Sequence, residues 1–217
     1  MSREFNPQYC IENREELRNL LSQAFIPKLG NPSQDDKAIK LWWTNFYKKY
    51  FGSSVDLSNV KIPDHQEGFD RVLIVAKDLK ITQVLHVLKS HMKVWLYKND
   101  LCDKDVPVND RDSKKDSYAV RFRNRIEADE ELKNRSVKDL KDDKISGITL
   151  LERLLMELAY FEETGKHLDI DNITLCSGSR YSNGHVPNVH WHDDELSVNL
   201  CFLGYSFDDL RSRAVVS

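Results

Sequence analysis

Residues 149–164 most strongly limit what this chain can fold into, because they carry a complete helix signal. Thr149 and Glu152 have the spacing of a capping box, in which each side chain satisfies a backbone N–H group at the helix start. Gly165, followed by Lys166, is typical of a helix end. The apolar stripe between them consists of Leu150, Leu151, Leu154, Leu155, Leu158 and Phe161. We therefore predict a long helix that buries its apolar stripe.

The segment after Thr174 predicts β structure and organised loops. It consists of short extended pieces and turn residues, such as SGSR, SNGH, VPNVHWH and LSVNLCF. These pieces leave no room for another long helix. A long helix followed by short strands indicates an α+β fold.

The preceding part of the chain predicts a mixture of helices and strands. The predicted elements are helices at 11–26, 35–51 and 81–92, strands at 69–76, 93–97 and 118–126, and a charged surface helix or loop at 127–144. Strand 69–76, helix 81–92 and strand 93–97 resemble one β-α-β unit. Strand 118–126 alternates strictly, which predicts a half-buried strand with arginines on its outer face.

Residues 99–117 give the best candidate for a domain boundary. They are polar, charged and rich in turn residues, which is typical of a solvated connector. We therefore predict an N-terminal helical and α/β portion at 1–105, of unknown role, and a second domain at 106–217.

The predicted helix at 35–51 carries an aromatic cluster with two interpretations. Trp42, Trp43, Phe46, Tyr47 and Tyr50, with Lys48 and Lys49, could stack on nucleobases. They could equally form part of a buried core. The chain has a formal net charge of -3 and shows no wider basic track, so we favour the core and expect no nucleic acid partner.

Localisation and redox state are predicted from what the sequence lacks. The N-terminus has no apolar targeting segment, and no apolar run is long enough for a membrane helix. We expect a cytoplasmic protein, or one exported by a route without a recognisable signal peptide. The four cysteines (Cys10, Cys102, Cys176 and Cys201) lie far apart without a CxxC motif, which predicts reduced and mostly buried thiols.

The last part of the chain has an unusual amino-acid alphabet. Residues 167–217 contain no Lys, Gln or Met, whereas residues 1–166 contain 19 Lys. Tyr, Asn, His, Ser, Asp, Gly and Phe replace them, which is typical of an adaptable contact surface. From Ser177 to Leu210, every residue except Trp191 and Glu195 is of a type that codons ending in a pyrimidine can encode. This bias has no folding rationale.

Several segments together carry a resemblance to a known fold. The segment ISGITLLERLLMELAYFEETG is followed by LCSGSR, by a loop-rich stretch around VHW, and by the closing LRSRAVV. This order resembles the C-type lectin-like fold, in the branch shared by formylglycine-generating enzymes and the variable proteins of diversity-generating retroelements. The resemblance covers about the last 70 to 110 residues, so it implies that the domain at 106–217 has this fold. It implies a family helix at 150–161, a Gly-Ser segment at 177–180 and a closing strand at 211–216.

The resemblance also implies a function. In the retroelement family, template adenines are mutated on reverse transcription, so that asparagine codons become codons for other residues near the C-terminus. The alphabet of residues 177–210 matches this expectation. It implies a non-catalytic protein without a cofactor, whose diversified surface binds a protein or other macromolecular ligand. The predicted ligand-binding residues are Tyr181, Asn183, His185, Asn188, His190, His192, Asn199, Phe202, Tyr205 and Phe207, with Trp191 as scaffold.

The alternative prediction is a metal-dependent enzyme. His190 and His192 stand two residues apart on a predicted strand, so their side chains would point the same way. Asp194 could complete a set of two histidines and one carboxylate. Nucleophilic catalysis through Cys176 or Cys201 is a weaker alternative, with Cys201 predicted to point away from the core.

Overall fold

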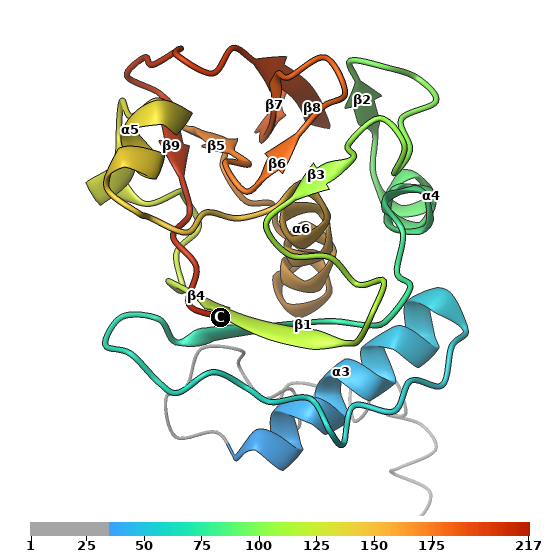
Figure 1. Cartoon of the computed structure of the whole chain (residues 1–217). Coiled ribbons are helices and arrows are strands. Elements are labelled where there is room, and N and C mark those ends of the chain that lie inside the picture. The colour runs from blue at the N-terminus through green and yellow to red at the C-terminus, as the bar shows by residue number, and fades with distance from the viewer. Residues whose placement is uncertain (1–34) are drawn as a thin grey trace, which may run out of the picture.

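The computed structural model describes residues 35–217, and it is a mixed α+β structure (Figure 1). The predicted helix at 11–26 lies outside the described residues. Helix α3 (Asp36–Phe51) begins where the Asp35 side chain accepts a hydrogen bond from the Lys37 N–H, and it ends at Gly52 in the left-handed conformation. Both ends agree with the predicted helix at 35–51.

The aromatic cluster of α3 belongs to the core, as predicted. Trp43, Phe46 and Tyr47 are buried and pack against one another. The Tyr47 hydroxyl donates to the Ile74 carbonyl at 2.8 Å and accepts from the Ala76 N–H at 2.9 Å. These bonds fix α3 against the next strand, so the rings are not free to stack on nucleobases.

A two-stranded antiparallel sheet lies above α3 in Figure 1. It pairs β1 (Arg71–Val75) with β4 (Tyr118–Phe122). Helix α4 (Ile81–His91) follows β1 and leads to β2 (Val94–Leu96), which belongs to a different sheet. The predicted β-α-β unit is therefore wrong. Strand β1 finds its partner more than 40 residues later, and local periodicity carries no information about that partner.

The larger sheet has five strands in the order β2-β8-β7-β5-β9. Its C-terminal members are β5 (Ile173–Leu175), β7 (Val186–His192), β8 (Glu195–Cys201) and β9 (Leu210–Ser212). Strands β7 and β8 form an antiparallel hairpin, whereas β2 runs parallel to β8 and β5 runs parallel to β9. A short pair of β3 (Val108–Asn109) and β6 (Ser179–Arg180) lies beside it.

Helix α6 (Leu150–Thr164) lies between the two main sheets and contacts β1, α4 and β7 (Figure 1). The predicted capping box of Thr149 and Glu152 is present, and Gly165 ends the helix in the left-handed conformation. Every residue from Leu150 to Ala159 is buried, including the polar ones. This part of the helix is therefore buried on all sides and not only along its apolar stripe, because elements cover it on several faces.

A second, smaller core lies under α5 (Val137–Asp142) and the short 3-10 helix Glu130–Leu132, within the predicted surface segment 127–144. Leu132, Val137 and Leu140 pack there against one end of the five-stranded sheet. Cys201 points away from the main core, as predicted, but it is buried in this second cluster and not exposed. The alternation of the strand could not reveal that Val137 and Leu140 of α5 belong to the same cluster as Cys201.

Strands from both sides of residue 105 pair with each other. Strand β2 joins β8, and β1 joins β4. The main hydrophobic core likewise contains residues from both portions, such as Leu88 and Leu154. Within residues 35–217, no helix is both long and apolar enough to cross a membrane.

Candidate binding face

The hairpin of β7 and β8 positions most of the predicted ligand-binding residues. Its turn consists of Asp193 and Asp194, which both adopt positive φ, at 49° and 60°. Two such residues are typical of the tight hairpin turns whose twist matches that of the strands, and Asp tolerates this conformation. Strand β7 therefore ends at His192, and the His192 ring lies 3.2 Å from the Asp193 carboxylate.

The outer face of the sheet is the one turned away from α6. His190 pairs with Ser197, and Ser197 pairs with Trp95 of β2, so these three residues lie in one row across three strands. The intervening residues, Val189 and Val198, are buried in the main core. Thus one set of alternate side chains on β7 and β8 lies on the outer face, and the other set packs into the main core.

The structure exposes some of the predicted ligand-binding residues and buries others. Asn183, His192, Phe202 and Tyr205 are exposed, whereas His185, His190, Asn199 and Phe207 are half-buried. Tyr181 and Asn188 are only 4% and 6% exposed. The Tyr181 hydroxyl donates to the Asn199 carbonyl, and Asn188 lies in the middle of β7 between two neighbouring strands. Both side chains are therefore covered by other parts of the chain and are not available on the surface.

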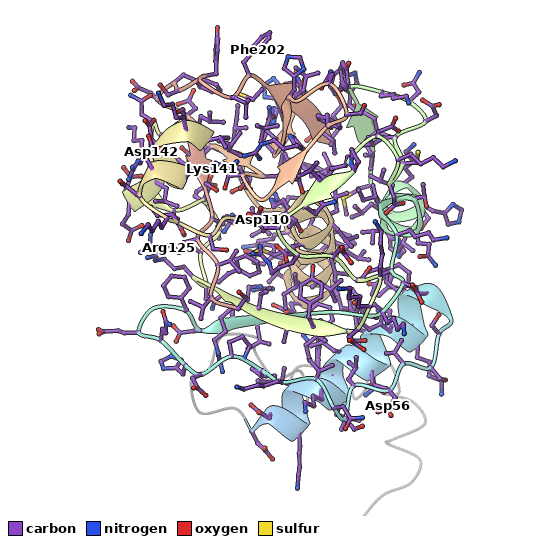
Figure 2. All side chains as sticks on the ribbon, viewed as in Figure 1. Asp56, Asp110, Arg125, Lys141, Asp142 and Phe202 are labelled. Carbon is purple, nitrogen blue, oxygen red and sulfur yellow. The ribbon has the colours of Figure 1, made fainter. Side chains whose placement is uncertain are left out.

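Four of the predicted residues form a continuous run of rings. The ring centroids of His185 and Phe202 are 4.6 Å apart, those of Phe202 and Tyr205 are 6.1 Å apart, and those of Tyr205 and Phe207 are also 6.1 Å apart. Phe202 projects from the end of the molecule opposite α3 (Figure 2). We call the loop 202–209 with His185 the aromatic tip. The rings of His190 and His192 lie 6.0 Å apart on the adjoining sheet face.

The charge of this region is negative. Residues 177–210 contain one arginine, no lysine and five carboxylates, at Asp193, Asp194, Glu195, Asp208 and Asp209. The arginine, Arg180, donates to the backbone carbonyls of Ser177 and Ser179, so its guanidinium is directed toward the chain itself. Burial, followed by the nearby His192, lowers the pKa of His190 below its ordinary value, which favours a neutral ring.

The predicted metal site is not assembled. Within residues 35–217, no group of three His, Cys, Asp or Glu side chains could hold a metal ion, and the set of His190, His192 and Asp194 is thus not brought together. The thiols also fit poorly with nucleophilic catalysis. Burial raises the pKa of both Cys176 and Cys201, which disfavours the reactive thiolate.

Two exposed aromatic residues of this face escaped the sequence prediction. Trp95 and Tyr97 of the β2 segment are 43% and 46% exposed, although they belong to the N-terminal portion. Trp95 pairs with Ser197, and the Tyr97 N–H donates to the Val198 carbonyl. The alternation of KVWLY could have indicated that both rings share one face. It could not have indicated that this face continues onto β8.

A buried network of charges holds the scaffold behind the face. Asp169 accepts hydrogen bonds from the Arg153 Nε at 2.8 Å and from an Arg213 Nη at 2.6 Å, and Arg153 also donates to Glu157 at 2.8 Å. Glu157 in turn contacts His167, whose ring stacks on Trp191 with a centroid distance of 3.3 Å. Trp191 is thus packed against the core, as predicted. The network itself was not predicted, although the i, i+4 spacing of an Arg and a Glu inside a leucine stripe was visible.

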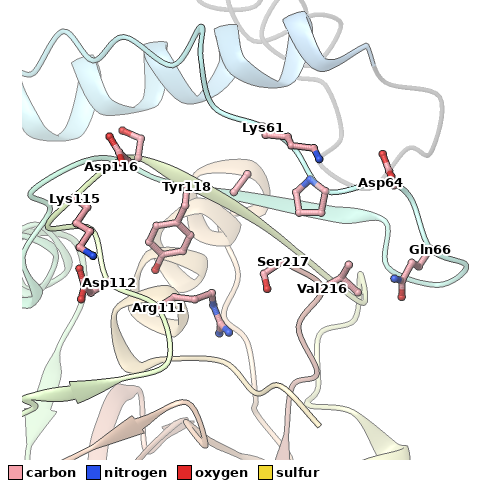
Figure 3. Close-up of a pocket in the computed structure, with 13 residues that line it drawn as sticks. Lys61, Asp64, Gln66, Arg111, Asp112, Lys115, Asp116, Tyr118, Val216 and Ser217 are labelled. Carbon is pink, nitrogen blue, oxygen red and sulfur yellow. The ribbon is translucent and has the colours of Figure 1, made fainter. Parts of the chain in front are cut away.

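A cavity of about 640 Å³ lies elsewhere, beside β4 (Figure 3). Two of its polar side chains, Arg111 and Tyr118, both bond to the buried Glu152 that caps α6. The rest of its lining mixes cations such as Lys61 with carboxylates such as Asp112. These two half-buried groups are therefore already bonded at the helix cap.

No protein-family model, no curated protein and no solved structure matches this chain.

Proposed function

We propose that this chain is a non-catalytic binding protein with a C-type lectin-like C-terminal domain, whose surface is diversified in the manner of retroelement variable proteins. Its ligand is a protein or another macromolecule. The observation that carries this proposal is the alphabet of residues 177–210, which lacks lysine and is nearly restricted to types encoded by pyrimidine-ending codons. Neither burial nor strand propensity accounts for such a restriction.

The position of the restricted segment supports the proposal. Its exposed residues lie in the turn 182–184, the turn 192–194 and the aromatic tip. Its two exceptions to the alphabet have structural partners: Trp191 stacks on His167, and Glu195 pairs across the hairpin with His192. Variation of the exposed side chains leaves the backbone ladder of β7 and β8 intact, because that ladder uses main-chain groups alone.

Contacts at the start of α6 support the C-type lectin-like part of the proposal. The Gly178 N–H donates to the Ile148 carbonyl, and the Ile148 N–H donates to the Arg213 carbonyl. The Gly-Ser segment and the closing strand therefore both contact the residue just before the helix cap. The resemblance implies that these three segments belong to one conserved unit, and here they share direct hydrogen bonds.

The first test is genomic. A reverse transcriptase gene should lie near the coding sequence, together with a near-copy of the segment encoding 177–210 that differs at adenines. In the copy, the codons for Asn183, His192, Phe202 and Tyr205 should read as asparagine codons. A gene neighbourhood with neither feature would contradict the diversification.

The second test is a comparison of two displayed libraries. One library randomises Asn183, His192, Phe202 and Tyr205 with pyrimidine-ending codons, and the matched control randomises four buried positions of the same segment (Val189, Leu196, Val198 and Leu210). We expect most members of the first library to remain folded, because exposed substitutions usually change stability by less than about 0.5 kcal/mol. The control should lose most of its folded members. Selection of the first library on immobilised streptavidin should then enrich specific binders, and equal loss of folding in both libraries would refute a tolerant surface.

A further inference from the structure

We propose that Trp95 and Tyr97 are fixed anchors of the binding face, and that the face of this chain binds a polypeptide segment bearing Lys or Arg. This inference rests on the proposed function and adds a partner class to it. Trp95 lies on β2 and Tyr97 directly follows this strand, so both stand outside the restricted segment, and both join it through backbone pairing with β8.

Exposure distinguishes these two residues from ordinary scaffold aromatics. A tryptophan and a tyrosine nearly half-exposed on one strand present a large apolar area to solvent. Exposed apolar patches with polar rims mark interaction sites, and Trp and Tyr are the residue types that most often dominate binding energy. The Tyr97 ring also lies 5.9 Å from that of the buried Tyr181, which holds it in place. The Tyr97 ring is therefore preorganised.

The chemistry around the anchors favours a cationic partner. The hairpin turn next to Glu195 of β8 contributes Asp193 and Asp194, both exposed, whereas Asp208 and Asp209 of the aromatic tip directly precede β9, at the opposite edge of the sheet from β2. Two lysines flank the anchors: Lys93 precedes β2 and is joined to the start of β8 by a backbone hydrogen bond, and Lys98 is already paired with Asp105 at 2.6 Å. Lysine and arginine side chains combine well with both features, because they pair with carboxylates and stack on the faces of Trp and Tyr.

The origin of the anchors matters for how the face works. Tryptophan has no pyrimidine-ending codon, so the diversification process could not create Trp95. Residue types at 190, 192, 199 and 202–207 can change between variants, while the rings beside them stay. A constant apolar anchor supplies part of the affinity, and the variable residues around it then decide between partners.

The experiment selects ligands from a random dodecapeptide phage library on the purified full chain. The enriched peptides should contain more Lys and Arg than the unselected library, and their affinity should fall when NaCl is raised from about 50 to about 300 mM, because salt screens exposed charges. Trp95→Ala and Tyr97→Ala should each weaken binding about tenfold or more. Leu41→Ala is the matched control, because Leu41 is 62% exposed on α3, at the opposite end of the molecule (Figure 1). It should leave binding unchanged.

The outcomes separate the two proposals. If Phe202→Ala weakens binding but Trp95→Ala and Tyr97→Ala do not, the anchor inference fails and the variable face stands. If Trp95→Ala and Tyr97→Ala weaken binding and Phe202→Ala does not, the anchor inference stands and the proposal of a variable binding face is contradicted. Enriched peptides without basic residues, or a library without any binder, would overturn the partner class. Binding to a glycan array but to no peptide would overturn it too.

Discussion

Replacing Asp169 with Asn should strongly destabilise the fold, because Asp169 is the centre of the buried charge network. Its carboxylate accepts hydrogen bonds from Arg153 and Arg213, at 2.8 and 2.6 Å, and from the Thr174 hydroxyl. Arg153 and Arg213 are 0% and 1% exposed. The network joins α6 to the segment after β9, so its loss releases the closing strand from the central helix.

The size of the expected stability loss follows from the charge balance of the buried network. Arg153 and Arg213 are matched by Asp169 and Glu157, and the substitution leaves one buried positive charge without a counter-charge. Removing one partner of a buried ion pair costs about 3–5 kcal/mol. Burial opposes ionisation of Asp169, but Arg213 and Arg153 outweigh it and hold the pKa of the carboxyl below its ordinary value. The contribution of Asp169 to the free energy of unfolding is therefore present above the pKa of the unfolded state, and it is lost as pH falls through the pKa of the folded state.

Urea unfolding followed by tryptophan fluorescence measures the effect. Trp191 stacks on His167, which contacts the same network, so its emission reports on this region. Asp208→Asn is the matched control, because it removes the same charge from an exposed position. The difference in the free energy of unfolding between wild type and Asp169→Asn should be largest near neutral pH and should disappear only at acidic pH. A loss below about 1 kcal/mol at pH 7 would refute the reasoning, since it would mean that the charges are not effectively buried.

Three further predictions concern the scaffold. Leu154→Ala should lower the free energy of unfolding by about 2–5 kcal/mol, because Leu154 is fully buried. His192→Ala should change it by no more than about 1 kcal/mol, because His192 is exposed. Equal losses would mean that core and surface are misassigned. Burial is the main cause that raises the pKa of Glu163 to about 7. Because the folded state must give up this proton as pH rises, the free energy of unfolding of the wild type should fall by up to about 3 kcal/mol between pH 5 and 8, relative to that of Glu163→Gln. Urea unfolding at both pH values measures this change. Parallel stability curves would contradict this assignment. Gly178→Ala should lower the melting temperature, because the added Cβ would lie 2.6 Å from a backbone carbonyl oxygen, whereas Gly204→Ala meets no neighbour and should not.

Sequence patterns predicted the helices well and the partners of strands poorly. The capping box and glycine stop of α6, and the acidic start of α3, are local signals that the structure confirms. The assignment of β2 to a β-α-β unit failed because strand pairing is set by distant residues. The alternation of β8 correctly puts Cys201 on the face of Asn199, away from the main core, but it could not show that a second core, which contains Val137 and Leu140, buries that end of the strand.

The candidate site was only partly visible in the sequence for a related reason. The restricted alphabet marks which residues differ from the rest of the chain, but it does not say which of them reach the surface. Tyr181 and Asn188 have the right residue types and are nevertheless buried. Trp95 and Tyr97 have ordinary sequence surroundings and nevertheless join the face. The second fact depends on the register of β2 against β8, which only the folded sheet defines.

The register of β7 against β8 yields a prediction about variants of this gene. Side chains alternate between the two faces of β7 and β8, so free variation is compatible with the outer face alone. Among natural copies, changes should therefore concentrate at His190, His192 and Asn199, while Val189 and Val198 keep apolar residues of similar volume. An inner position made polar would bury an unsatisfied group against α6, at a cost of about 1–3 kcal/mol. Sequencing the locus from many isolates measures the pattern. Equal variation on both faces would show that the outer face is not the one under diversification.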